Sequence, residues 1–548
     1  MLESATTVEP YDLVAVGSGA GGLTAAITVA EHGGRAIVVE KDSCLGGVTA
    51  LSVGQIWLGA NSLAAEAGIA DSVDDAVAYL DFLAGDLGDR ELRRRYIEDG
   101  SEAIDFLYQK IGIQLSVIRR HPDYWYPKGT GSKAEGRYLE VATYDREQLG
   151  PLAEKFRKVN PYGTDLINTA DVVEADLDAS KIEEAIRIHQ KRDELCGGAA
   201  LAASLVAAAA ARGVQLRTDT RAVRIVTDGE GRVAGVEVED PQGSAVIPTR
   251  AVLLATGGYD WNPGFVQTFE HKPSLPSMAP RTIEGDHLMM ASEIGGWVDS
   301  GRPSSTPLNL GFQVPGAEYD GKPLYENMAS LRPGAIIVNA RGKRFADESF
   351  YPDVNGAYNN FDGGEQRMSN SPAWLVFDAK YLRNYGFQTY QTLRPGEALP
   401  GGVGNVGKDL PELAVAAGID ASGLVETVER FNAFCAQGVD EDFGRGTIPW
   451  SRMYMGDLRV QPNPLLGPLT EGPFYAIKLT PVGTSIVSAG LKVDAAGRVL
   501  NARGGTVPGL YAAGNAAARS DVVGYQSGIA NMKGIQLGYV AGRDIMKA

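Results

Sequence analysis

The sequence predicts an α/β protein in which a parallel-sheet domain is interrupted by an inserted second domain. A strand, a glycine-rich turn, a helix and a second strand follow one another within residues 11–40. Another apolar strand runs into paired glycines at residues 251–258. Residues 276–447 are richer in proline, tyrosine and irregular loops, after which strand-like segments return. Strands that alternate with helices build a parallel sheet, and the change of composition marks an insertion into it.

The first unit has the pattern of a dinucleotide-binding turn. The strand of residues 11–16 leads into the turn Gly17-Ser18-Gly19-Ala20-Gly21-Gly22, and the next strand ends at Glu40, 21 positions after Gly19. One glycine of such a turn permits the bend, a second lets the backbone approach a pyrophosphate, and a third lets the helix pack on the strand. The acid accepts a hydrogen bond from a ribose hydroxyl. A turn needed only for packing would leave Glu40 unexplained.

The remaining segments extend the same fold. Residues 46–52 form a small-residue loop that could run along the diphosphate. Residues 213–240 alternate like strands joined by a D-G-E-G turn, which predicts a β-meander. We therefore expect a dinucleotide-binding domain in two parts, residues 1–275 and 448–548, and an inserted α+β domain at residues 276–447.

Length and composition exclude several classes of protein. A chain of 548 residues is too long for one ordinary core, so two domains are expected. A net charge of −17 argues against a nucleic-acid partner, because such proteins usually carry a basic stripe. Three scattered cysteines predict neither a disulfide framework nor a metal site. No secretory signal and no apolar run long enough for a membrane span are found, so the cytoplasm is the expected compartment.

Three motifs together resemble the FAD-containing fumarate reductase and 3-ketosteroid dehydrogenase superfamily. They are GSGAGG with Glu40, the strand AVLLATGG, and GLYAAGN at residues 509–515. Gly285-Asp286, where His287 replaces the usual second glycine, and EDFGRG at residues 441–446 support the resemblance. The resemblance implies that FAD lies across the sheet and that the inserted domain, residues 276–447, is a catalytic cap that closes over it. No histidine follows Gly47 until His121, so the resemblance implies noncovalent FAD.

The resemblance also implies the set of residues that would contact the FAD. These are Gly17, Gly19, Ala20, Gly21, Gly22, Glu40, Lys41, Gly46, Gly47, Val48, Thr49, Ser52, Gly54, Val223, Ala255, Thr256, Gly257, Gly258, Asp286, Gly514, Asn515, Gly528, Ile529 and Ala530.

Two branches of the superfamily differ at positions that this sequence lets us compare. The branch that reduces dicarboxylates grips its substrate with arginines, and Pro352 and Tyr525 stand at two of those positions. A dianion bound without these partners would leave buried carboxylates unpaired, at a cost of several kcal/mol. Fumarate reduction is therefore disfavoured.

The ketosteroid dehydrogenase branch has a tyrosine ten residues after the asparagine of its AGN turn, and Tyr525 fits that position after Asn515. The resemblance implies that this hydroxyl and a glycine amide, here Gly528, hold the ketone oxygen of the substrate. The family glycine comes four residues after the tyrosine, whereas Gly528 comes three after, so this loop is one residue shorter. A neutral tyrosine beside an amide at a helix start forms an oxyanion-hole arrangement.

Two further tyrosines of that branch have candidates here. The base would be Tyr351, which stands one position early in DESFYP, with Tyr358 in reserve. A third tyrosine, either Tyr124 or Tyr126, lies in HPDYWYPKGTGSKAEGRYLE. The implied reaction removes the α-proton with a tyrosine whose pKa a neighbouring hydroxyl lowers, and passes the β-hydrogen as hydride to flavin N5.

The product of this reaction would be an α,β-unsaturated cyclic ketone. A 3-oxosteroid and an oxo-cyclohexane both remain open as substrates, and the acceptor that reoxidises FAD is not identified. Two alternatives also stay open, a fumarate-reductase-like enoate reductase and a noncatalytic electron-transfer flavoprotein subunit. The second predicts loss of polar groups from the pocket, whereas tyrosines are present at all three family positions.

Overall fold

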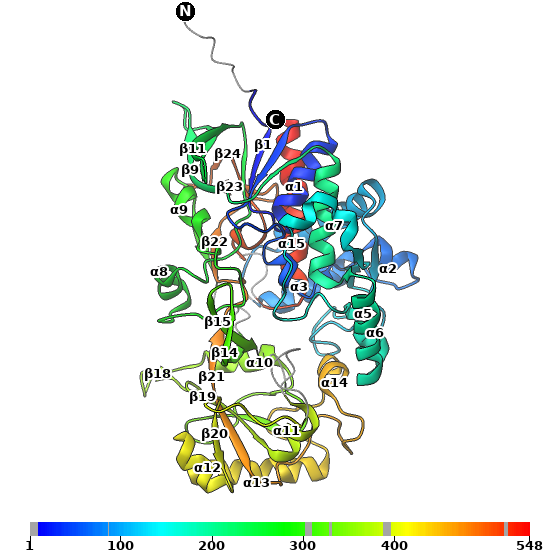
Figure 1. Cartoon of the computed structure of the whole chain (residues 1–548), viewed down its shortest axis with the longest axis vertical. Coiled ribbons are helices and arrows are strands. Elements are labelled where there is room, and N and C mark those ends of the chain that lie inside the picture. The colour runs from blue at the N-terminus through cyan, green and yellow to red at the C-terminus, as the bar shows by residue number, and fades with distance from the viewer. Residues whose placement is uncertain (1–8, 86, 302–308, 328–330, 387–395, 520–523) are drawn as a thin grey trace, which may run out of the picture.

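The computed structural model of the chain has two regions stacked along its long axis (Figure 1). It describes residues 9–85, 87–301, 309–327, 331–386, 396–519 and 524–548. The region at the top of Figure 1 carries the parallel sheet and the C-terminal helix, and the lower region carries the second sheet with its own helices. This is the mixed α/β architecture that the sequence predicts.

The first sheet has the strand order β23-β24-β12-β1-β2-β8. Its five strands from β24 to β8 are parallel, and β23 is an antiparallel edge strand. The strands are β1 (Leu13–Val16), β2 (Ala36–Val39), β8 (Gln215–Arg217), β12 (Val252–Leu254), β23 (Arg498–Leu500) and β24 (Thr506–Ala512). The central strands are fully buried, as parallel strands covered on both faces are.

Two helices that pack closely on each other cover this sheet. They are α1 (Ala20–Glu31) and α15 (Ile529–Lys547), and α7 (Gly197–Ala211) lies beside α1. A Cβ added to Gly538 of α15 would lie 2.4 Å from the backbone oxygen of Gly21. The glycines therefore allow the backbones to approach, which sets the C-terminal helix against the start of α1.

The antiparallel meander predicted from residues 213–240 is present. It is formed by β9 (Arg221–Thr227), β10 (Val233–Asp240) and β11 (Gly243–Pro248). Smaller elements of this region are β3 (Ile56–Trp57), β4 (Leu115–Val117), β5 (Tyr138–Val141), β6 (Tyr144–Asp145), β7 (Glu194–Leu195), β13 (Val298–Ser300), β22 (Ala489–Leu491), α2 (Ser62–Glu66), α3 (Val73–Ala84), α4 (Arg90–Asp105), α5 (Thr169–Ala175), α6 (Ala179–Lys191), α8 (Pro263–Phe265) and α9 (Asp286–Glu293).

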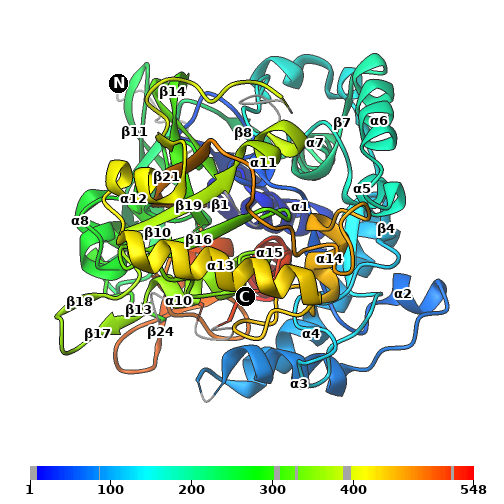
Figure 2. The ribbon, with the colours of Figure 1, turned by 90° about the horizontal axis from the view of Figure 1, so that it is seen from below.

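The second sheet has the order β15-β14-β21-β19-β16, with β20 also paired to β21. Helices α12 and α13 cover one face, and α10 and α11 pack on the other. Figure 2 shows α13 lying across the lower end of the molecule. The elements are β14 (Asn309–Tyr319), β15 (Lys322–Asn327), β16 (Ala335–Asn339), β17 (Phe361–Asp362), β18 (Arg367–Met368), β19 (Ala373–Asp378), β20 (Asn405–Gly407), β21 (Phe474–Val482), α10 (Tyr351–Tyr358), α11 (Ala379–Tyr385), α12 (Leu410–Ala417), α13 (Ala421–Gln437) and α14 (Pro449–Met455).

Strand β21 shows where the chain returns to the first region. It lies between β14 and β19, although the predicted boundary after residue 447 assigns it to the dinucleotide-binding domain. The chain near residue 276 lies beside the end of β21, since Met278 N donates to Gly483 O at 2.9 Å and Gly483 N donates to Pro276 O at 2.7 Å. Helix α9 and strand β13 follow this point and still belong to the first region, and the second sheet begins with β14. The division into domains otherwise remains a prediction.

Candidate active site

The glycine turn after β1 divides its glycines between packing and an open cavity. A Cβ on Gly17, whose φ is +106°, would lie 2.4 Å from Ala255 O, and one on Gly22 would lie 2.0 Å from Gly17 O. A Cβ on Gly19 would meet only Thr49 Oγ1, at 3.7 Å. Gly17 and Gly22 therefore pack the turn, whereas Gly19 presents bare backbone to the cavity.

This turn borders a cavity of about 340 Å³. Most of the residues that the sequence assigns to the cofactor line it. They are Gly17, Gly19, Ala20, Gly21, Glu40, Lys41, Gly47, Val48, Thr49, Ser52, Ala255, Thr256, Gly257, Asp286, Gly514, Asn515, Gly528 and Ala530. These residues come from five separate stretches of the chain, and the parallel sheet brings them to one edge.

The other predicted cofactor residues lie behind this lining. They are Gly22, Gly46, Gly54, Val223, Gly258 and Ile529. Ala222 lines the cavity in place of Val223, because successive side chains of a strand point to opposite faces. Gly46 and Gly258 contact residues that line the cavity. The Gly46 amide donates to Ser18 Oγ at 3.0 Å, and the Gly258 amide donates to Ser485 Oγ at 3.1 Å.

Several lining residues were not predicted from the sequence. Asp42, Gln55, Tyr162, Arg221, Ser485, Ser527 and Asn531 are among them. Ser18, inside the turn itself, could have been found from its position between the glycines. The others belong to no motif, whether they lie in loops or, like Arg221 in β9 and Asn531 in α15, in regular elements, so the sequence carries no signal for them.

Glu40 lies at the base of the cavity and is 7% exposed. Its carboxylate accepts hydrogen bonds from Ser18 N at 2.9 Å, from Ser18 Oγ at 2.6 Å and from Asp42 N at 2.9 Å. Burial raises the pKa of Glu40, and these hydrogen bonds oppose the rise. A carboxylate has roughly four acceptor sites, so capacity remains for a ribose hydroxyl.

The cavity fits a dinucleotide. Bare backbone at Gly19, at the start of α1, offers amides and a positive helix end to phosphates, and Glu40 offers an acceptor to a ribose. Gly514 on the facing side is also open, since a Cβ there would meet only Gly534 Cα at 3.9 Å. A side chain at either glycine would fill space that a close-lying ligand needs.

Three tyrosines gather beside this cavity. The hydroxyls of Tyr124 and Tyr351 are 2.9 Å apart. The ring of Tyr525, which lines the cavity, has its centroid 6.0 Å from that of Tyr124 and 5.8 Å from that of Tyr351. Trp450 packs on Tyr124 and Tyr351 at 4.6 and 5.9 Å. We call Tyr124, Tyr351 and Tyr525 the tyrosine cluster.

Each member of the tyrosine cluster is held by a different element. Tyr351 is the first residue of α10, and Tyr525 precedes the start of α15. Gln526 connects the segment of Tyr525 to helix α3 and to the loop of Tyr124. Its Oε1 accepts from the Tyr79 hydroxyl at 2.5 Å and from the Tyr124 amide at 3.2 Å. The cluster is therefore fixed by tertiary contacts, since its members are distant in sequence.

Burial raises the pKa of all three hydroxyls. For Tyr351 the neighbouring hydroxyls of Tyr124 and Tyr525 raise the pKa further. The expectation that a neighbouring tyrosine lowers the pKa of Tyr351 is thus wrong for this arrangement, because desolvation dominates. At Tyr525 burial is again the largest cause, whereas Tyr351 and the cation of Arg519 act to lower the pKa.

The candidate tyrosines and the candidate glycine lie at different places in the structure. Tyr124 is in the cluster, while among the described residues no ring contact joins Tyr126 to it. Tyr358 lies at the other end of α10 and its hydroxyl is 2.9 Å from Ser371 Oγ. Gly528, with φ of +86°, is the N-cap residue of α15. A Cβ at this position would lie 2.6 Å from Trp57 N.

The two histidines that the sequence singled out are buried. His121 Nε2 is 2.8 Å from the Tyr454 hydroxyl, and burial lowers the pKa of His121 to about 3. His287 lies in the first turn of α9 with Nδ1 2.8 Å from Thr256 Oγ1. The replacement of the usual glycine is therefore accommodated inside a helix.

In the described part of the chain, no helix has the length and apolarity needed to cross a membrane.

Comparisons with known proteins show the family of this chain. The FAD binding domain family matches residues 12–532. The chain is 35% identical over 547 residues to 4-oxocyclohexanecarboxylate 2-dehydrogenase of Sinomonas cyclohexanicum, which covers 98% of this chain and 92% of that protein. It is 31% identical over 551 residues to 3-oxosteroid 1-dehydrogenase of Mycolicibacterium smegmatis, covering 95% of this chain and 94% of that protein.

A solved structure extends the likeness to the whole fold. The 3-ketosteroid delta1-dehydrogenase from Sterolibacterium denitrificans, in complex with 1,4-androstadiene-3,17-dione, superposes with a TM-score of 0.89 at 26% identity. The match covers 98% of this chain and 100% of that one. This chain is an FAD-dependent oxidoreductase, and it belongs to the FAD binding domain family, with the 3-ketosteroid dehydrogenases and fumarate reductases among its relatives.

Proposed function

We propose that this protein is a flavin-dependent dehydrogenase that introduces a C=C bond next to the ketone of a six-membered ring. The observation that carries the proposal is the tyrosine cluster at the edge of the FAD cavity, where hydroxyls lie close to one another and one of them lines the cavity. A hydroxyl that can hold a ketone oxygen and another that can take an α-proton are the two groups that this reaction needs.

The residues divide the chemistry as follows. The Tyr525 hydroxyl and the Gly528 amide hold the ketone oxygen and stabilise the enolate as it forms. The Tyr351 oxygen accepts the α-proton, with the Tyr124 hydroxyl as its hydrogen-bond partner at 2.9 Å. Bound FAD would supply the hydride acceptor for the β-hydrogen, and loss of the α-proton and the β-hydride from adjacent carbons would leave the C=C bond between them. The cation of Arg519, which donates to Gly524 O at 2.9 Å, adds positive charge near Tyr525.

The ring that carries the ketone is the open part of the proposal. The named relatives divide between 3-oxosteroids and an oxocyclohexanecarboxylate. Both ketones have the α- and β-hydrogens that the reaction removes, so the chemistry of the tyrosine cluster is common to both. The aromatic surroundings of the cluster, Trp450, Phe350 and Trp125, suit an alicyclic ring.

Anaerobic mixing of the FAD-loaded protein with a panel of cyclic ketones tests the proposal. A 3-oxosteroid, 4-oxocyclohexanecarboxylate and unsubstituted cyclohexanone are mixed separately, and bleaching of the flavin absorbance is followed with time. We expect bleaching by at least one ketone, with an α,β-unsaturated ketone as product. Oxidation of the reduced flavin by fumarate or an enoate, without bleaching by any ketone, would favour the reductase alternative. If no ketone bleaches the flavin and neither fumarate nor an enoate oxidises the reduced flavin, an electron-transfer subunit would be favoured.

We also propose that the FAD is held without a covalent link. His121, the first histidine after Gly47, is buried with its ring 3.9 Å from the ring centroid of Tyr138. Precipitation with acid should therefore release all of the flavin into the supernatant. Flavin that stays with the pellet would contradict this proposal and leave the proposed reaction untouched.

A further inference from the structure

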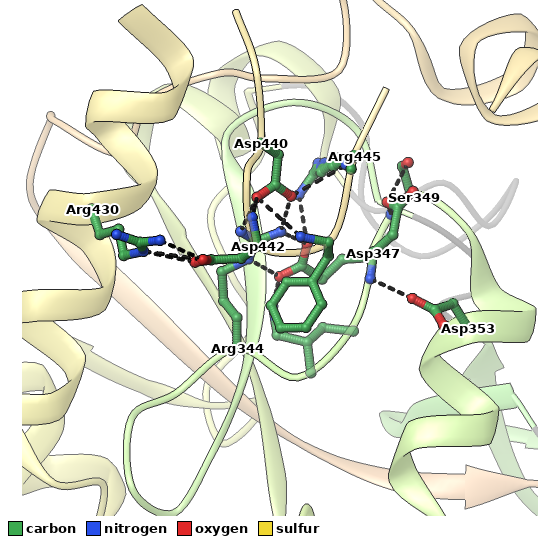
Figure 3. Close-up of polar contacts among 12 residues, drawn as sticks. Arg344, Asp347, Ser349, Asp353, Arg430, Asp440, Asp442 and Arg445 are labelled. Atoms are coloured by element: carbon green, nitrogen blue, oxygen red, sulfur yellow. Dashed lines mark hydrogen bonds and ion pairs between the residues drawn. The ribbon is translucent and has the colours of Figure 1, made fainter. Parts of the chain in front are cut away.

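A buried ion-pair cluster includes Glu348, three residues before Tyr351, and Figure 3 shows its Arg344, Asp440 and Arg445. It contains two arginines and two carboxylates, Arg344, Arg445, Glu348 and Asp440. Their side chains are between 0% and 3% exposed. The charges balance within the cluster, so no member is a buried ion without a partner.

Arg344 joins two segments of the chain by paired hydrogen bonds. Its Nε and Nη2 donate to the two oxygens of Glu348 at 2.7 and 2.8 Å. Its Nη1 and Nη2 donate to the oxygens of Asp440 at 3.1 and 2.8 Å. Two forked contacts of this kind fix direction as well as distance, because the guanidinium is planar and rigid.

Arg445 adds a third segment to the cluster. It donates to Glu348 Oε2 at 3.2 Å, to Ala335 O at 2.7 Å and to Arg332 O at 2.9 Å. Its own amide donates to Asp440 Oδ2 at 3.3 Å. Arg445 thereby connects the start of β16 with the segment before α10 and with the loop before α14.

Hydrogen bonds of Asp347 connect the segment around Glu348 to the first turn of α10. Asp347 Oδ1 accepts from Ser349 N at 2.8 Å and from Ser349 Oγ at 2.6 Å. The Asp347 amide donates to Asp353 Oδ2, in the first turn of α10, at 2.8 Å. A displacement of Glu348 is therefore passed to the start of α10, where Tyr351 stands.

The loop from Asp440 to Arg445 leads in the same way to the other side of the tyrosine cluster. Helix α14 begins at Pro449, and its Trp450 packs on Tyr124 and Tyr351. The hydroxyl of Tyr454, one turn later, is 2.8 Å from His121 Nε2. The ion-pair cluster thus holds both the tyrosine at the start of α10 and the ring that packs against it.

We infer that Glu348, Arg344, Arg445 and Asp440 are positioning residues that hold Tyr351 at the distance and angle needed to take the α-proton. The inference rests on the proposed function, in which Tyr351 is the base. The four side chains touch neither the cavity nor the tyrosine cluster, so they act through the backbone of residues 348–351 and 445–450.

Replacement of Glu348 by glutamine tests this inference, since the side chain keeps its size and loses its charge. Displacement of a reacting group by about 1 Å can cost about 10²-fold in rate. We therefore expect flavin reduction in Glu348→Gln to slow by about 10²-fold, with KM and FAD retention close to wild type. A merely structural role would instead raise KM and release FAD.

Asp442→Asn is the matched control. Asp442 is in the same loop and pairs with Arg430, but that pair lies on the exposed side, with Arg430 57% exposed (Figure 3). We expect an unchanged reduction rate in this variant. Equal slowing in Asp442→Asn and Glu348→Gln would overturn the inference, because the effect would then belong to the loop as a whole.

A second readout does not depend on turnover. Loosening of α14 should expose Trp450 to a neutral fluorescence quencher, and the difference between each variant and the same variant carrying Trp450→Phe isolates this one tryptophan of six. We expect greater quenching in Glu348→Gln than in Asp442→Asn. If Glu348→Gln fails to fold, Arg445→Lys replaces it, since lysine keeps the charge but cannot reach Ala335 O and Arg332 O together.

The outcomes for the inference and for the proposed function are separable. If Tyr351→Phe is slow while folded Glu348→Gln, or Arg445→Lys in its place, reduces flavin at the wild-type rate, the positioning role is wrong and the proposed reaction stands. If Tyr351→Phe itself reduces flavin at the wild-type rate, the base is misassigned and the inference falls with it.

Discussion

The turn that borders the FAD cavity comes from six consecutive residues, whereas the tyrosine cluster beside it comes from three loops around residues 124, 351 and 525. In the turn, Gly22 packs against Gly17 of the same six residues, although Gly17 also packs against Ala255, which follows the neighbouring strand β12. In the cluster, the hydroxyls of Tyr124 and Tyr351 meet only because α10 and the loop after β4 fold against each other. A local motif therefore specifies the turn at the cofactor site, whereas packing between distant segments brings the tyrosine hydroxyls together.

The largest effect is expected from Tyr351→Phe, which removes one hydroxyl from the cluster and leaves the cavity unchanged. Flavin reduction by a ketone substrate should slow by about 10²-fold or more, because general base catalysis typically contributes 10²–10⁴-fold. Stopped-flow absorbance measures the rate. Tyr358→Phe is the control on the same helix, since its hydroxyl contacts Ser371 Oγ instead. Slowing in Tyr358→Phe alone would transfer the role to that residue.

The pH dependence of the same rate sharpens this prediction. Burial and the neighbouring hydroxyls raise the pKa of Tyr351, so the tyrosinate is scarce at neutral pH. The rate of flavin reduction should therefore rise with pH through the alkaline range, and it should not level off near the ordinary tyrosine pKa of about 10. Tyr351→Phe should lose this rise. A wild-type rate that levels off near neutral pH would point to a different base.

The next effect is expected from Tyr525→Phe, which lies where the two regions meet. The hydroxyl binds more tightly as the enolate forms, so kcat should fall more than KM rises, by about 10²-fold for a single oxyanion donor. Steady-state kinetics give both constants. A tyrosine that only packs would keep its ring contacts with Tyr124 and Tyr351 as phenylalanine, so a fall of only a few-fold would remove the ketone clamp from the proposal.

Gly19→Ala tests the cofactor side of the comparison. The added Cβ would occupy space that the phosphates need, so FAD affinity should fall by about tenfold or more, which corresponds to about 1.4 kcal/mol. Fluorescence titration of the flavin-free protein measures it. Gly229→Ala is the control, because no atom lies within 4 Å of a Cβ at that surface turn. Unchanged affinity in Gly19→Ala would mean that the phosphates lie elsewhere.

The last effect concerns the free energy of unfolding and leaves catalysis and FAD affinity aside. Asp260 Oδ2 accepts from Ser277 Oγ at 2.5 Å and from Ser485 N at 2.8 Å. Burial raises the pKa of Asp260 from 3.8 to about 6. The folded state therefore binds the proton more readily, and stability from this group is gained as pH falls through about 6 and is complete below 3.8.

Comparison of wild type with Asp260→Asn isolates this group. As pH falls across that window, the free energy of unfolding of wild type should rise relative to the variant, by about 1.4 kcal/mol for each unit of pKa shift. Denaturant unfolding at several pH values measures it. A difference that does not change with pH would show that Asp260 titrates normally.

The fold shows which features the sequence could predict. The parallel unit of residues 11–40 and the meander of residues 213–240 form as predicted, because each is completed by contacts close in sequence. Strand β21 follows the predicted boundary at residue 447 but pairs with β14 and β19 of the second sheet, because its alternating pattern does not say which sheet it joins. Its partners, β14 and β19, are supplied only by the folded cap.

Residues of the candidate site also differ in whether the sequence alone could predict them. By itself the sequence determined a dinucleotide turn with its acid and the residue types of three tyrosines, because backbone geometry at glycines and the end of a strand are local properties. Only the tertiary structure decided that Tyr124 rather than Tyr126, and Tyr351 rather than Tyr358, stand together. The direction of a side chain on a loop or at a helix start depends on what packs against it, and here Trp450 packs against Tyr351.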